Sequence, residues 1–477
     1  MTVISGKVLK LNGWPEGPLI RLAKDAAQRL WEAGLDRDAI LERLNAVRAN
    51  PAAFQNDEAV GELARELTTH YTRPSTHERD ESLREQPVNY RVWGREFIDP
   101  AALTQMDNAA RLPVSVAGAL MPDAHVGYGL PIGGVLATEG AVIPYAVGVD
   151  IACRMRLSIY DVSPIVLGQK PSQFEKALLH QTRFGMGAKW GKNERPDHPV
   201  LEDEAWDELP LLRHLHDIAV EQLGTSGTGN HFVEWGEFEL QQPEAQLGLA
   251  PGRYLALLSH SGSRGVGFKI AEHYSRLAME LHPKLEKSVR HLAWLDLDTD
   301  PGREYWLAME LAGRFASANH AIIHQRVSAA VGLQEVASVE NHHNFAWVET
   351  LPDGRRVIVH RKGATPAGPG VLGVIPGSMG DAGFVVRGRG VPESLNSAAH
   401  GAGRQMSRKQ ALHTITKSER DRYLRERGIT LLGGGLDESP QAYKRIADII
   451  AAQSDLVDIV GKFTPRIVRM AEEPGDW

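Results

Sequence analysis

Glycine is concentrated in one stretch of this 477-residue chain, and the concentration limits the paths that the backbone can take there. Eleven glycines fall between Gly363 and Gly403. Glycine accepts positive φ angles and lets other groups come close to the backbone. The density therefore predicts a segment that turns repeatedly around a bound ligand.

The chain beyond residue 88 alternates between short β-rich segments and helical stretches. The β-rich segments end in glycine-rich or histidine-bearing turns and cover residues 134–138, 152–160, 254–259, 356–360 and 384–387. Helical patterns occur near residues 203–222, 266–281, 302–330 and 440–452. The length allows either one large α/β unit or two to three ordinary domains.

Residues 15–70 have a helical pattern. Apolar residues recur at helical spacing between Leu19 and Trp31, a second helix follows the N-cap candidate Asp36 and ends near Asn50, and a third covers about residues 57–69. Residues 72–87 are almost free of apolar side chains, which marks a linker or an exposed loop. We therefore expect residues 1–87 to form a helical extension that ends in a polar linker.

The composition is ordinary for a globular protein, with 42% hydrophobic and 24% charged residues. The chain has no apolar run of about 18 residues, and its first residues lack a signal-peptide pattern. We expect a cytoplasmic protein without a membrane partner. The single cysteine, Cys153, excludes an intrachain disulfide, so any special role must be as a thiol or a metal ligand.

A net charge of −7 argues against a surface that coats nucleic acid broadly. This net charge does not exclude a local basic groove, because one window of the chain is rich in arginine and lysine. The alternative is that this window forms a solvated charged face. The residues of that window are Arg387, Arg389, Arg404, Arg408 and Lys409.

One histidine stands between small residues in the segment Ser394-Leu-Asn-Ser-Ala-Ala-His-Gly-Ala-Gly-Arg404. Alanine and glycine leave space at the reactive face of His400. The backbone N–H groups of the following turn, together with the Arg404 guanidinium, are suited to hold a phosphate. The alternative is a tight loop that carries a surface histidine.

Metal-ligand residue types recur in the same chain. Asp150 lies three residues before Cys153, and this mixture of hard oxygen and soft thiolate suits borderline divalent ions such as Mn²⁺, Co²⁺ or Zn²⁺. Further histidines stand within two residues of glycine or asparagine in Asn230-His-Phe-Val-Glu234, in His260-Ser-Gly-Ser-Arg-Gly265 and in Glu340-Asn-His-His-Asn-Phe345. A buried cysteine or histidine alone is an ordinary structural group. Together these residues predict a metal site built on strand ends.

Two further turns could support such a site. In the segment Asp123–Gly134, Asp123 and His125 could orient metal ligands through hydrogen bonds, and a purely structural loop is the alternative. Gly377-Ser-Met-Gly380 offers a hydroxyl and free amides as a cradle for a nucleobase or phosphate. The chain contains no P-loop motif, no Lys-x-Asp-Gly nucleotidyl-transfer motif and no Gly-x-Ser-x-Gly elbow.

Eight ordered motifs between residues 89 and 465 resemble the RtcB family of RNA-splicing ligases, GTP- and Mn²⁺-dependent enzymes that join RNA ends through a guanylylated histidine. The motifs are Met121-Pro-Asp-Ala-His, Val147-Gly-Val-Asp-Ile-Ala-Cys153, Gly227-Thr-Gly-Asn-His-Phe, His260-Ser-Gly-Ser-Arg-Gly, His342-His-Asn, His360-Arg-Lys-Gly-Ala, Pro376-Gly-Ser-Met-Gly and His400-Gly-Ala-Gly-Arg404. The resemblance implies an α+β fold: a single large mixed α/β domain over residues 88–477, with central β-sheets around the active-site cleft.

The resemblance also implies residue roles. His400 is the expected nucleophile, with two Mn²⁺ ions held by Asp150, Cys153 and His231 and by Cys153, His260 and His343. His343 is chosen over its neighbour because the family motif places the ligand directly before Asn344. The expected nucleotide contacts are Asn230, Glu234, Asn344, Gly377, Ser378, Met379, Gly401, Ala402, Gly403, Arg404 and Arg469.

The implied reaction joins an RNA 3′-phosphate or 2′,3′-cyclic phosphate end to a 5′-hydroxyl end, through histidine-GMP and a GMP-activated RNA 3′ end, in RNA repair or tRNA splicing. Archease, the activating partner of many family members, is the protein partner that the resemblance implies. The sequence does not decide whether this chain needs archease, which RNA is its physiological substrate, or what its oligomeric state is. The alternatives are a metal-dependent RNA end-processing phosphodiesterase and a non-catalytic nucleotide- and RNA-binding relative.

Three positions depart from the family pattern. Arg154 follows the cysteine where glycine is usual, and Gly383 stands where a serine is common. The family's terminal Lys-Gly is replaced by a different C-terminal sequence, in which Arg469 is the expected substitute for the lysine that reaches the guanylate.

Overall fold

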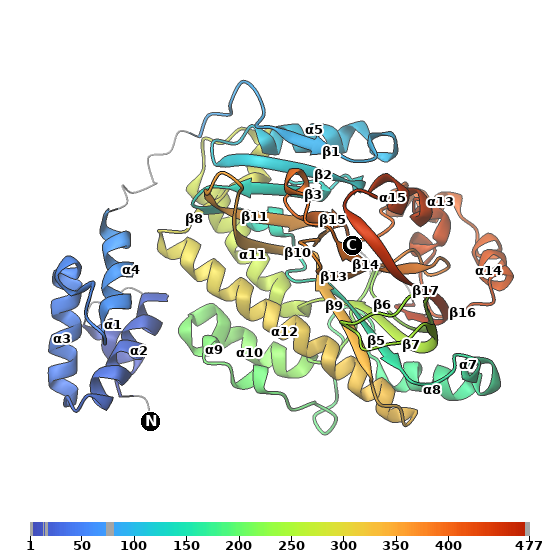
Figure 1. The fold of residues 1–477 in the computed structure, drawn as a ribbon, viewed down its shortest axis with the longest axis horizontal. Helices are drawn as coiled ribbons and strands as arrows, with labels where there is room; N and C mark the ends of the chain where they lie inside the picture. Colours follow the sequence, from blue (N-terminus) through green and yellow to red (C-terminus); the bar gives the residue numbers. More distant parts are fainter. Residues whose placement is uncertain (1–2, 13, 15–17, 73–80, 473–477) are drawn as a thin grey trace.

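The computed structural model describes residues 3–12, 14, 18–72 and 81–472 of the chain. Figure 1 shows a small helical unit at one side of a much larger body of mixed helices and strands. The small unit contains α1 (Gly6–Leu11), α2 (Pro18–Glu32), α3 (Arg37–Ala49) and α4 (Gly61–Thr72). Its hydrophobic core draws its buried residues only from positions 4–67.

The three helices that the sequence predicted in this unit are present as α2, α3 and α4. The side chain of Asp36 caps α3, because it accepts hydrogen bonds from the backbone N–H groups of Asp38 and Ala39. Residues 73–80 of the expected linker lie outside the described residues. Residues 81–87 pack on the large body, where the backbone N–H of Arg84 donates to the carbonyl of Arg111 at 2.8 Å.

The large body contains two main β-sheets. The first has the strand order β1-β2-β3-β11-β10, and only its β1–β2 pair is parallel. Its strands are β1 (Tyr90–Val92), β2 (Ser115–His125), β3 (Ile132–Thr138), β10 (Asn344–Thr350) and β11 (Arg356–Lys362). Two short pairs accompany the main sheets, β12 (Ala364–Pro366) with β15 (Ser397–Ala399) and β4 (Ala141–Val142) with β8 (Leu295–Asp296).

The second sheet has the order β13-β14-β17-β6-β7-β5-β9, and β16 joins β17 in parallel. Its strands are β5 (Arg154–Tyr160), β6 (Phe232–Leu240), β7 (Gly252–Ser261), β9 (Ala337–His342), β13 (Leu372–Ile375), β14 (Gly383–Gly388), β16 (Thr430–Leu432) and β17 (Val457–Met470). Central strands of this sheet are buried on both faces. Along β7, Leu255 and Leu257 belong to one hydrophobic cluster, whereas Ala256 and Leu258 belong to another.

Helices cover the sheets. The longest, α12 (Asp300–Ala330), packs Ile323 and Val327 against the second sheet together with α8 (Pro171–Gln181). The others in the body are α5 (Pro100–Ala110), α6 (Pro144–Val147), α7 (Val166–Gln169), α9 (Ala205–Glu208), α10 (Pro210–Gln222), α11 (Arg264–Leu281), α13 (Arg408–Thr414), α14 (Lys417–Glu426) and α15 (Ile446–Ala452). The strands and helices predicted beyond residue 88 are present, except that the helix predicted near residues 440–452 is divided into a short 3₁₀ helix, η8 (Pro440–Ala442), and α15.

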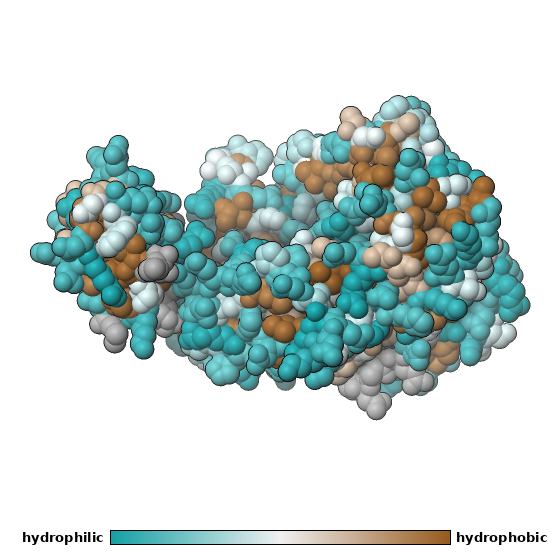
Figure 2. Space-filling model, turned by 90° about the horizontal axis from the view of Figure 1, so that it is seen from below, coloured by the Kyte–Doolittle hydropathy of each residue, from teal (hydrophilic) through white to brown (hydrophobic). Residues whose placement is uncertain are grey.

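The surface in Figure 2 is mainly hydrophilic, with hydrophobic residues in separate patches. Among the described helices, none combines the length and apolar character that crossing a membrane requires.

The predicted metal ligands gather because several strands of the second sheet begin or end at one edge. Arg154, the first residue of β5, pairs with Ser261 on β7 and with His342 on β9. Phe232, the first residue of β6, pairs with His260. The residues just beyond these strand ends therefore face one another across the sheet edge, as expected from the sequence.

Candidate active site

A cavity of about 790 Å³ lies at this edge. Most of the predicted site residues line it, although they come from segments far apart in the chain. Those that line the cavity are His125, Asp150, Cys153, Asn230, His231, His260, His343, Asn344, Gly377, Ser378, Met379, His400, Gly401, Ala402, Gly403 and Arg404. Asp123, Glu234 and Arg469 do not line it.

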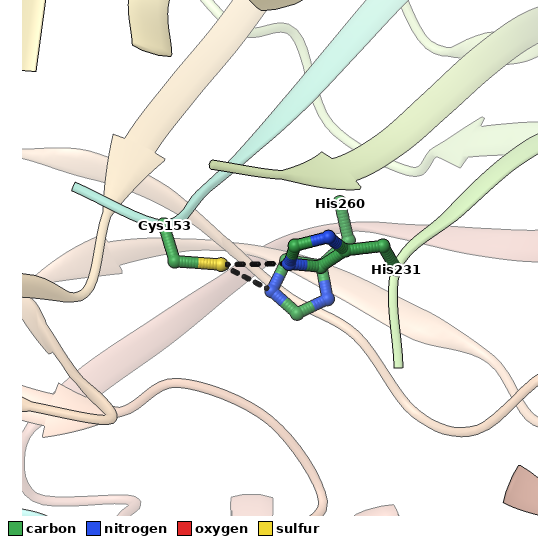
Figure 3. Close-up of side chains that lie close together, drawn as sticks. All are labelled: Cys153, His231 and His260. Atoms are coloured by element: carbon green, nitrogen blue, oxygen red, sulfur yellow. Dashed lines mark hydrogen bonds between the residues drawn. The ribbon is translucent and has the colours of Figure 1, made fainter. Parts of the chain in front are cut away.

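Cys153, His231 and His260 form a buried cluster inside the cavity. The Cys153 Sγ atom lies 3.1 Å from Nε2 of His260 and 3.4 Å from Nε2 of His231. Figure 3 shows the sulfur pointing toward both imidazole rings. Their ligand atoms all lie within 4.8 Å of one another, which is a spacing that one metal ion can bridge.

Two more predicted ligands border this cluster. Oδ2 of Asp150 lies 3.0 Å from Nε2 of His231, and Nε2 of His343 lies 3.2 Å from Nε2 of His260. The neighbouring His342 instead places its ring 5.0 Å, between centroids, from Phe345 and from Trp347. The geometry therefore supports His343 rather than His342 as a ligand.

The protonation states of the cluster suit a cation. Burial lowers the pKa of His260 and of His343 well below the usual range, so both rings are neutral. Nδ1 of His260 lies 3.1 Å from the carbonyl of Asn230, which fixes the proton on Nδ1 and leaves the Nε2 lone pair directed at the cluster. Burial alone would favour the neutral acid of Asp150, but His231 and Arg264 hold its pKa at about 2.

The thiol of Cys153 is the one group of the cluster whose pKa shift does not favour binding a cation. Burial, and then the adjacent Asp150 carboxylate, raise the pKa of its thiol well above the usual range. A bound divalent cation reverses this preference, because a coordinating thiol is deprotonated outright. The carboxylate, the thiol and the imidazoles thus fit a metal site.

His400 lies beside this cluster, with its ring centroid 4.9 Å from that of His343. Nδ1 of His400 is 2.7 Å from Oδ2 of Asp123, and the backbone N–H of His400 donates to the same oxygen at 3.1 Å. Asp123 is fully buried at the end of β2. It does not reach the cavity itself, but it orients the histidine that does.

The turn after His400 packs tightly on the same aspartate. Gly403 has a φ of +71°, and a Cβ atom at this position would lie 2.1 Å from the carbonyl oxygen of Asp123. Only glycine fits there. The Arg404 guanidinium donates to the carbonyl of Asp437 at 2.7 Å and to Glu438 at 3.2 Å, so its orientation is set before any ligand binds.

Two more residues predicted to contact the nucleotide are Glu234, which does not line the cavity, and Asn344, which does. Glu234 lies on β6 two residues beyond Phe232, which lines the cavity, so strand alternation puts both on one face. Burial raises the pKa of Glu234 well above its usual range. The Asn344 amide donates to the carbonyl of Asp150 and accepts from the backbone N–H of Gly363, so it joins two segments of the cavity wall.

The position of Arg469 does not support the contact expected from the sequence. Val468 and Met470 lie on the face of β17 that packs against Met379, and Met470 lines the cavity. Arg469 therefore points to the opposite face, where its guanidinium donates to the carbonyl of Leu432 at 3.0 Å. Strand alternation removes it from the cavity.

Arg154 and Gly383, the other two departures from the family pattern, do not line the cavity either. The Arg154 side chain is buried, forms an ion pair with Glu340 and donates to the carbonyl of Gly313 at 3.1 Å.

Lys362 is a site residue to which the sequence analysis gave no role. It lines the cavity, and burial lowers the pKa of its amine to about 7. Its Nζ donates to the carbonyl of Tyr128. The sequence could have pointed to Lys362, because it stands in His360-Arg-Lys-Gly-Ala, which is one of the eight motifs.

Comparison with known proteins supplies the family. The family model described as tRNA-splicing ligase RtcB matches residues 105–471. The RNA-splicing ligase RtcB of Escherichia coli (strain K12) is 35% identical over 393 residues, which cover 76% of this chain and 92% of that protein. The tRNA-splicing ligase RtcB of Thermococcus kodakarensis is 30% identical over 459 residues, with coverage of 79% and 94%. The RNA-splicing ligase RtcB of Mycobacterium tuberculosis is 32% identical over 428 residues, with coverage of 76% and 98%.

The chain belongs to the RtcB family of RNA-splicing ligases. The family, the α+β fold class and the enzyme class expected from the sequence are thereby confirmed.

Proposed function

We propose that this protein joins an RNA 3′-phosphate or 2′,3′-cyclic phosphate end to a 5′-hydroxyl end, using GTP, in RNA repair or tRNA splicing. One observation carries the proposal: Asp123 forms a hydrogen bond with Nδ1 of His400, and the His400 ring lies against that of His343, which borders the Cys/His cluster. This arrangement combines a nucleophile with groups that can hold a cation beside a phosphate.

His400 acts as the nucleophile. Because a carboxylate oxygen only accepts hydrogen bonds, Nδ1 carries the ring proton and Nε2 keeps its lone pair. Nε2 attacks the α-phosphate of GTP, and pyrophosphate leaves. The ring gains positive charge as the N–P bond forms, and the Asp123 carboxylate stabilises that charge.

The GMP group then passes to the RNA 3′-phosphate and frees His400. The 5′-hydroxyl oxygen of the second RNA finally attacks the activated phosphate and displaces GMP. A 2′,3′-cyclic phosphate is first opened by hydrolysis. The Arg404 guanidinium, held by the turn at residues 437–438, is positioned to contact a phosphate in the cavity.

Five residues would hold two Mn²⁺ ions, with the Cys153 thiolate shared between them. Asp150, Cys153 and His231 form one set, and Cys153, His260 and His343 form the other. The short distances from Cys153 to His231 and His260 support the shared role. When bound, the ions neutralise phosphate charge and polarise the attacking oxygen.

The guanylate would lie against the turn at residues 377–379 and the turn at residues 401–404, with Asn230 and Asn344 nearby. Glu234 favours guanine as the base. Its carboxyl group is buried, and guanine offers two N–H donors on one edge that would stabilise the carboxylate form. Arg469 has no part in this site.

Labelling with GTP tests the proposal. The protein is incubated with α-labelled GTP and Mn²⁺ and then denatured, and retained label reports the covalent intermediate. His400→Ala should abolish labelling, whereas His413→Ala, which removes an exposed histidine of α13, should keep it. Label retained on the His400 variant would contradict the nucleophile. A phosphodiesterase would process RNA ends without any covalent label.

The organisation of the chain is also part of the proposal. Residues 1–87 form an extension with a polar linker; the separate hydrophobic core of α1–α4 supports this division for the helices, whereas residues 81–87 pack against the catalytic domain. Every proposed catalytic residue lies beyond residue 120. Archease activation and a cytoplasmic location stay predictions from the sequence.

A further inference from the structure

Three aromatic side chains meet beside the cavity, and two of them, Tyr128 and Tyr145, line it. Tyr128 follows β2, Tyr145 is in α6, and His291 is in the short 3₁₀ helix η5 (Lys287–Leu292). The ring centroids of Tyr145 and His291 are 5.0 Å apart, and those of Tyr128 and His291 are 6.1 Å apart, both edge-on. Tyr128 is 69% exposed, so much of its ring is open to solvent.

The loop that carries Tyr128 is fixed from both sides. The side-chain amide of Gln105 bonds both the N–H and the carbonyl of Gly127, at 3.0 Å and 2.5 Å. Gly129 has a φ of +71°, and a Cβ atom there would lie 3.1 Å from the carbonyl oxygen of His291. A glycine at this position thus lets the loop lie directly on η5, which brings Tyr128 to His291.

The same loop is linked to the catalytic end of the cavity. The Tyr128 carbonyl accepts a hydrogen bond from Lys362, and a Cβ atom at the next residue, Gly363, would lie 3.1 Å from the His400 ring. Tyr128 and Tyr145 line the same cavity as His400. A polymer whose end reaches His400 can therefore pass across these rings.

The three rings have no role in the reaction described above. Their surroundings combine exposed aromatic surface with an exposed basic residue, Arg290, next to His291. Single-stranded nucleic acid is bound by this combination, because bases stack on aromatic rings while the backbone contacts cations. A ring that is fixed before binding loses little conformational freedom on contact.

The geometry points to a stacking platform, made by Tyr128, Tyr145 and His291, for an unpaired base close to the RNA end that reacts at His400. This inference rests on the proposed function, because it takes RNA as the ligand of the cavity. The base stacks on the exposed surface of Tyr128, and the rings of Tyr145 and His291 lie beside Tyr128, with centroids 6.4 Å and 6.1 Å away. Any of the four bases can stack in this way, so the platform selects unpaired ends rather than a sequence.

Equilibrium binding tests the platform with two fluorescent single-stranded RNAs, one with a 3′-phosphate and one with a 5′-hydroxyl. Tyr128→Ala should weaken the affinity for at least one of them by about 5- to 100-fold, the range expected for one stacked base. Tyr128→Phe, which keeps the ring, should stay within about 2-fold. Trp31→Ala, which removes an aromatic side chain that is 52% exposed on α2, is the matched control and should bind as the unaltered protein does. Unchanged affinity of Tyr128→Ala for both RNAs would overturn the platform.

Abasic substitutions then locate the base. In the unaltered protein, an abasic nucleotide at the stacking position should weaken binding by the same factor as Tyr128→Ala. In the Tyr128→Ala protein, that abasic nucleotide should cause no further loss. If the loss of affinity from the abasic nucleotide and the loss from Tyr128→Ala multiply at every position of the RNA, the base does not stack on Tyr128. GTP labelling decides the proposed function separately, because a protein that fails to label can still be scored for RNA binding.

Discussion

The Oδ2 atom of Asp123 accepts hydrogen bonds from both the ring Nδ1 and the backbone nitrogen of His400, at 2.7 Å and 3.1 Å. The two residues are 277 positions apart in the chain, and the carboxylate is fully buried. This pair fixes the tautomer of His400, its ring orientation and the start of the turn that follows. Nε2 is thereby the ring nitrogen that stays available for the proposed attack.

Asp123→Ala should slow guanylylation by about 10- to 100-fold, the range expected for one hydrogen bond to a charged group. The variant loses the group that holds the proton on Nδ1 and stabilises the charged ring during attack. Single-turnover labelling with α-labelled GTP measures the rate. Metal content is the control and should not change, because Asp123 lies outside the Cys/His cluster. Labelling at the original rate would show that the hydrogen bond has no part in the attack.

Cys153→Ala and His343→Ala should each lower the amount of Mn²⁺ that the protein retains. The first removes the sulfur near both histidines, and the second removes a nitrogen 3.2 Å from His260. His342→Ala is the matched control, because its ring packs against Phe345 and Trp347. Elemental analysis after dialysis gives the occupancy. Equal metal loss in the His342 and His343 variants would contradict the ligand assignment.

Lys362 should make stability depend on pH. Burial lowers the pKa of its amine from 10.5 in the unfolded chain to about 7 in the folded protein. Below pH 7 both states bind the proton, and the folded state bears the full cost of burying the charge. Above pH 7 only the unfolded state binds it, so the free energy of unfolding rises with pH until the unfolded amine also titrates.

Lys362→Met removes this titration. The variant should be more stable than the original protein at pH 6, and the difference should narrow steadily toward pH 10. Between pH 6 and pH 10, the difference in the free energy of unfolding between the two proteins should change by an amount on the order of a few kcal/mol, at about 1.36 kcal/mol for each pKa unit. Urea unfolding across that pH range measures it. A difference that stays constant with pH would mean that the folded amine titrates near its ordinary value.

Arg469→Ala should leave the GTP dependence of labelling unchanged within about 2-fold. Its guanidinium donates to Leu432 on the face of β17 opposite Met470, so it cannot replace a lysine that contacts the guanylate. Labelling over a range of GTP concentrations gives the comparison. Arg404→Ala is the positive control, because Arg404 lines the cavity and loss of its charged hydrogen bond should weaken labelling about 10- to 100-fold. A similar weakening in the Arg469 variant would restore the expectation from the sequence.

A chain that begins at residue 81 should still take up GMP. Residues 81–87 are kept because Arg84 bonds to Arg111, Pro113 and Ser115 of the large body. The rate of labelling should match that of the full chain within about 2-fold, since α1–α4 have their own hydrophobic core. Loss of labelling in a truncated protein with an intact circular dichroism spectrum would give the extension a direct role in catalysis.

Local sequence was sufficient for the elements and for the residue types of the site. The N-cap Asp36, the apolar spacing of α2 and the β-rich segments all depend on residues within one or two turns or strand lengths, so their patterns are visible in the chain. The ligand types are equally visible, because the candidate ligands and His400 stand in short motifs that also contain glycine or asparagine. The long strand β17 was not predicted, and its pairing with β6, more than 200 residues earlier, has no local signal.

The sequence by itself thus determined the helices of the extension and the mixed fold, and it predicted the metal-binding residue types and the role of His400. Only the tertiary structure decided that Asp123 bonds to His400, that His343 rather than His342 faces His260, and that Arg469 lies outside the cavity. It also brought Tyr128, Tyr145 and His291 together from three separate segments. The physical reason is the same in each case: which face of a strand a side chain occupies, and which distant loop it meets, depend on strand register and on packing between segments far apart in the chain.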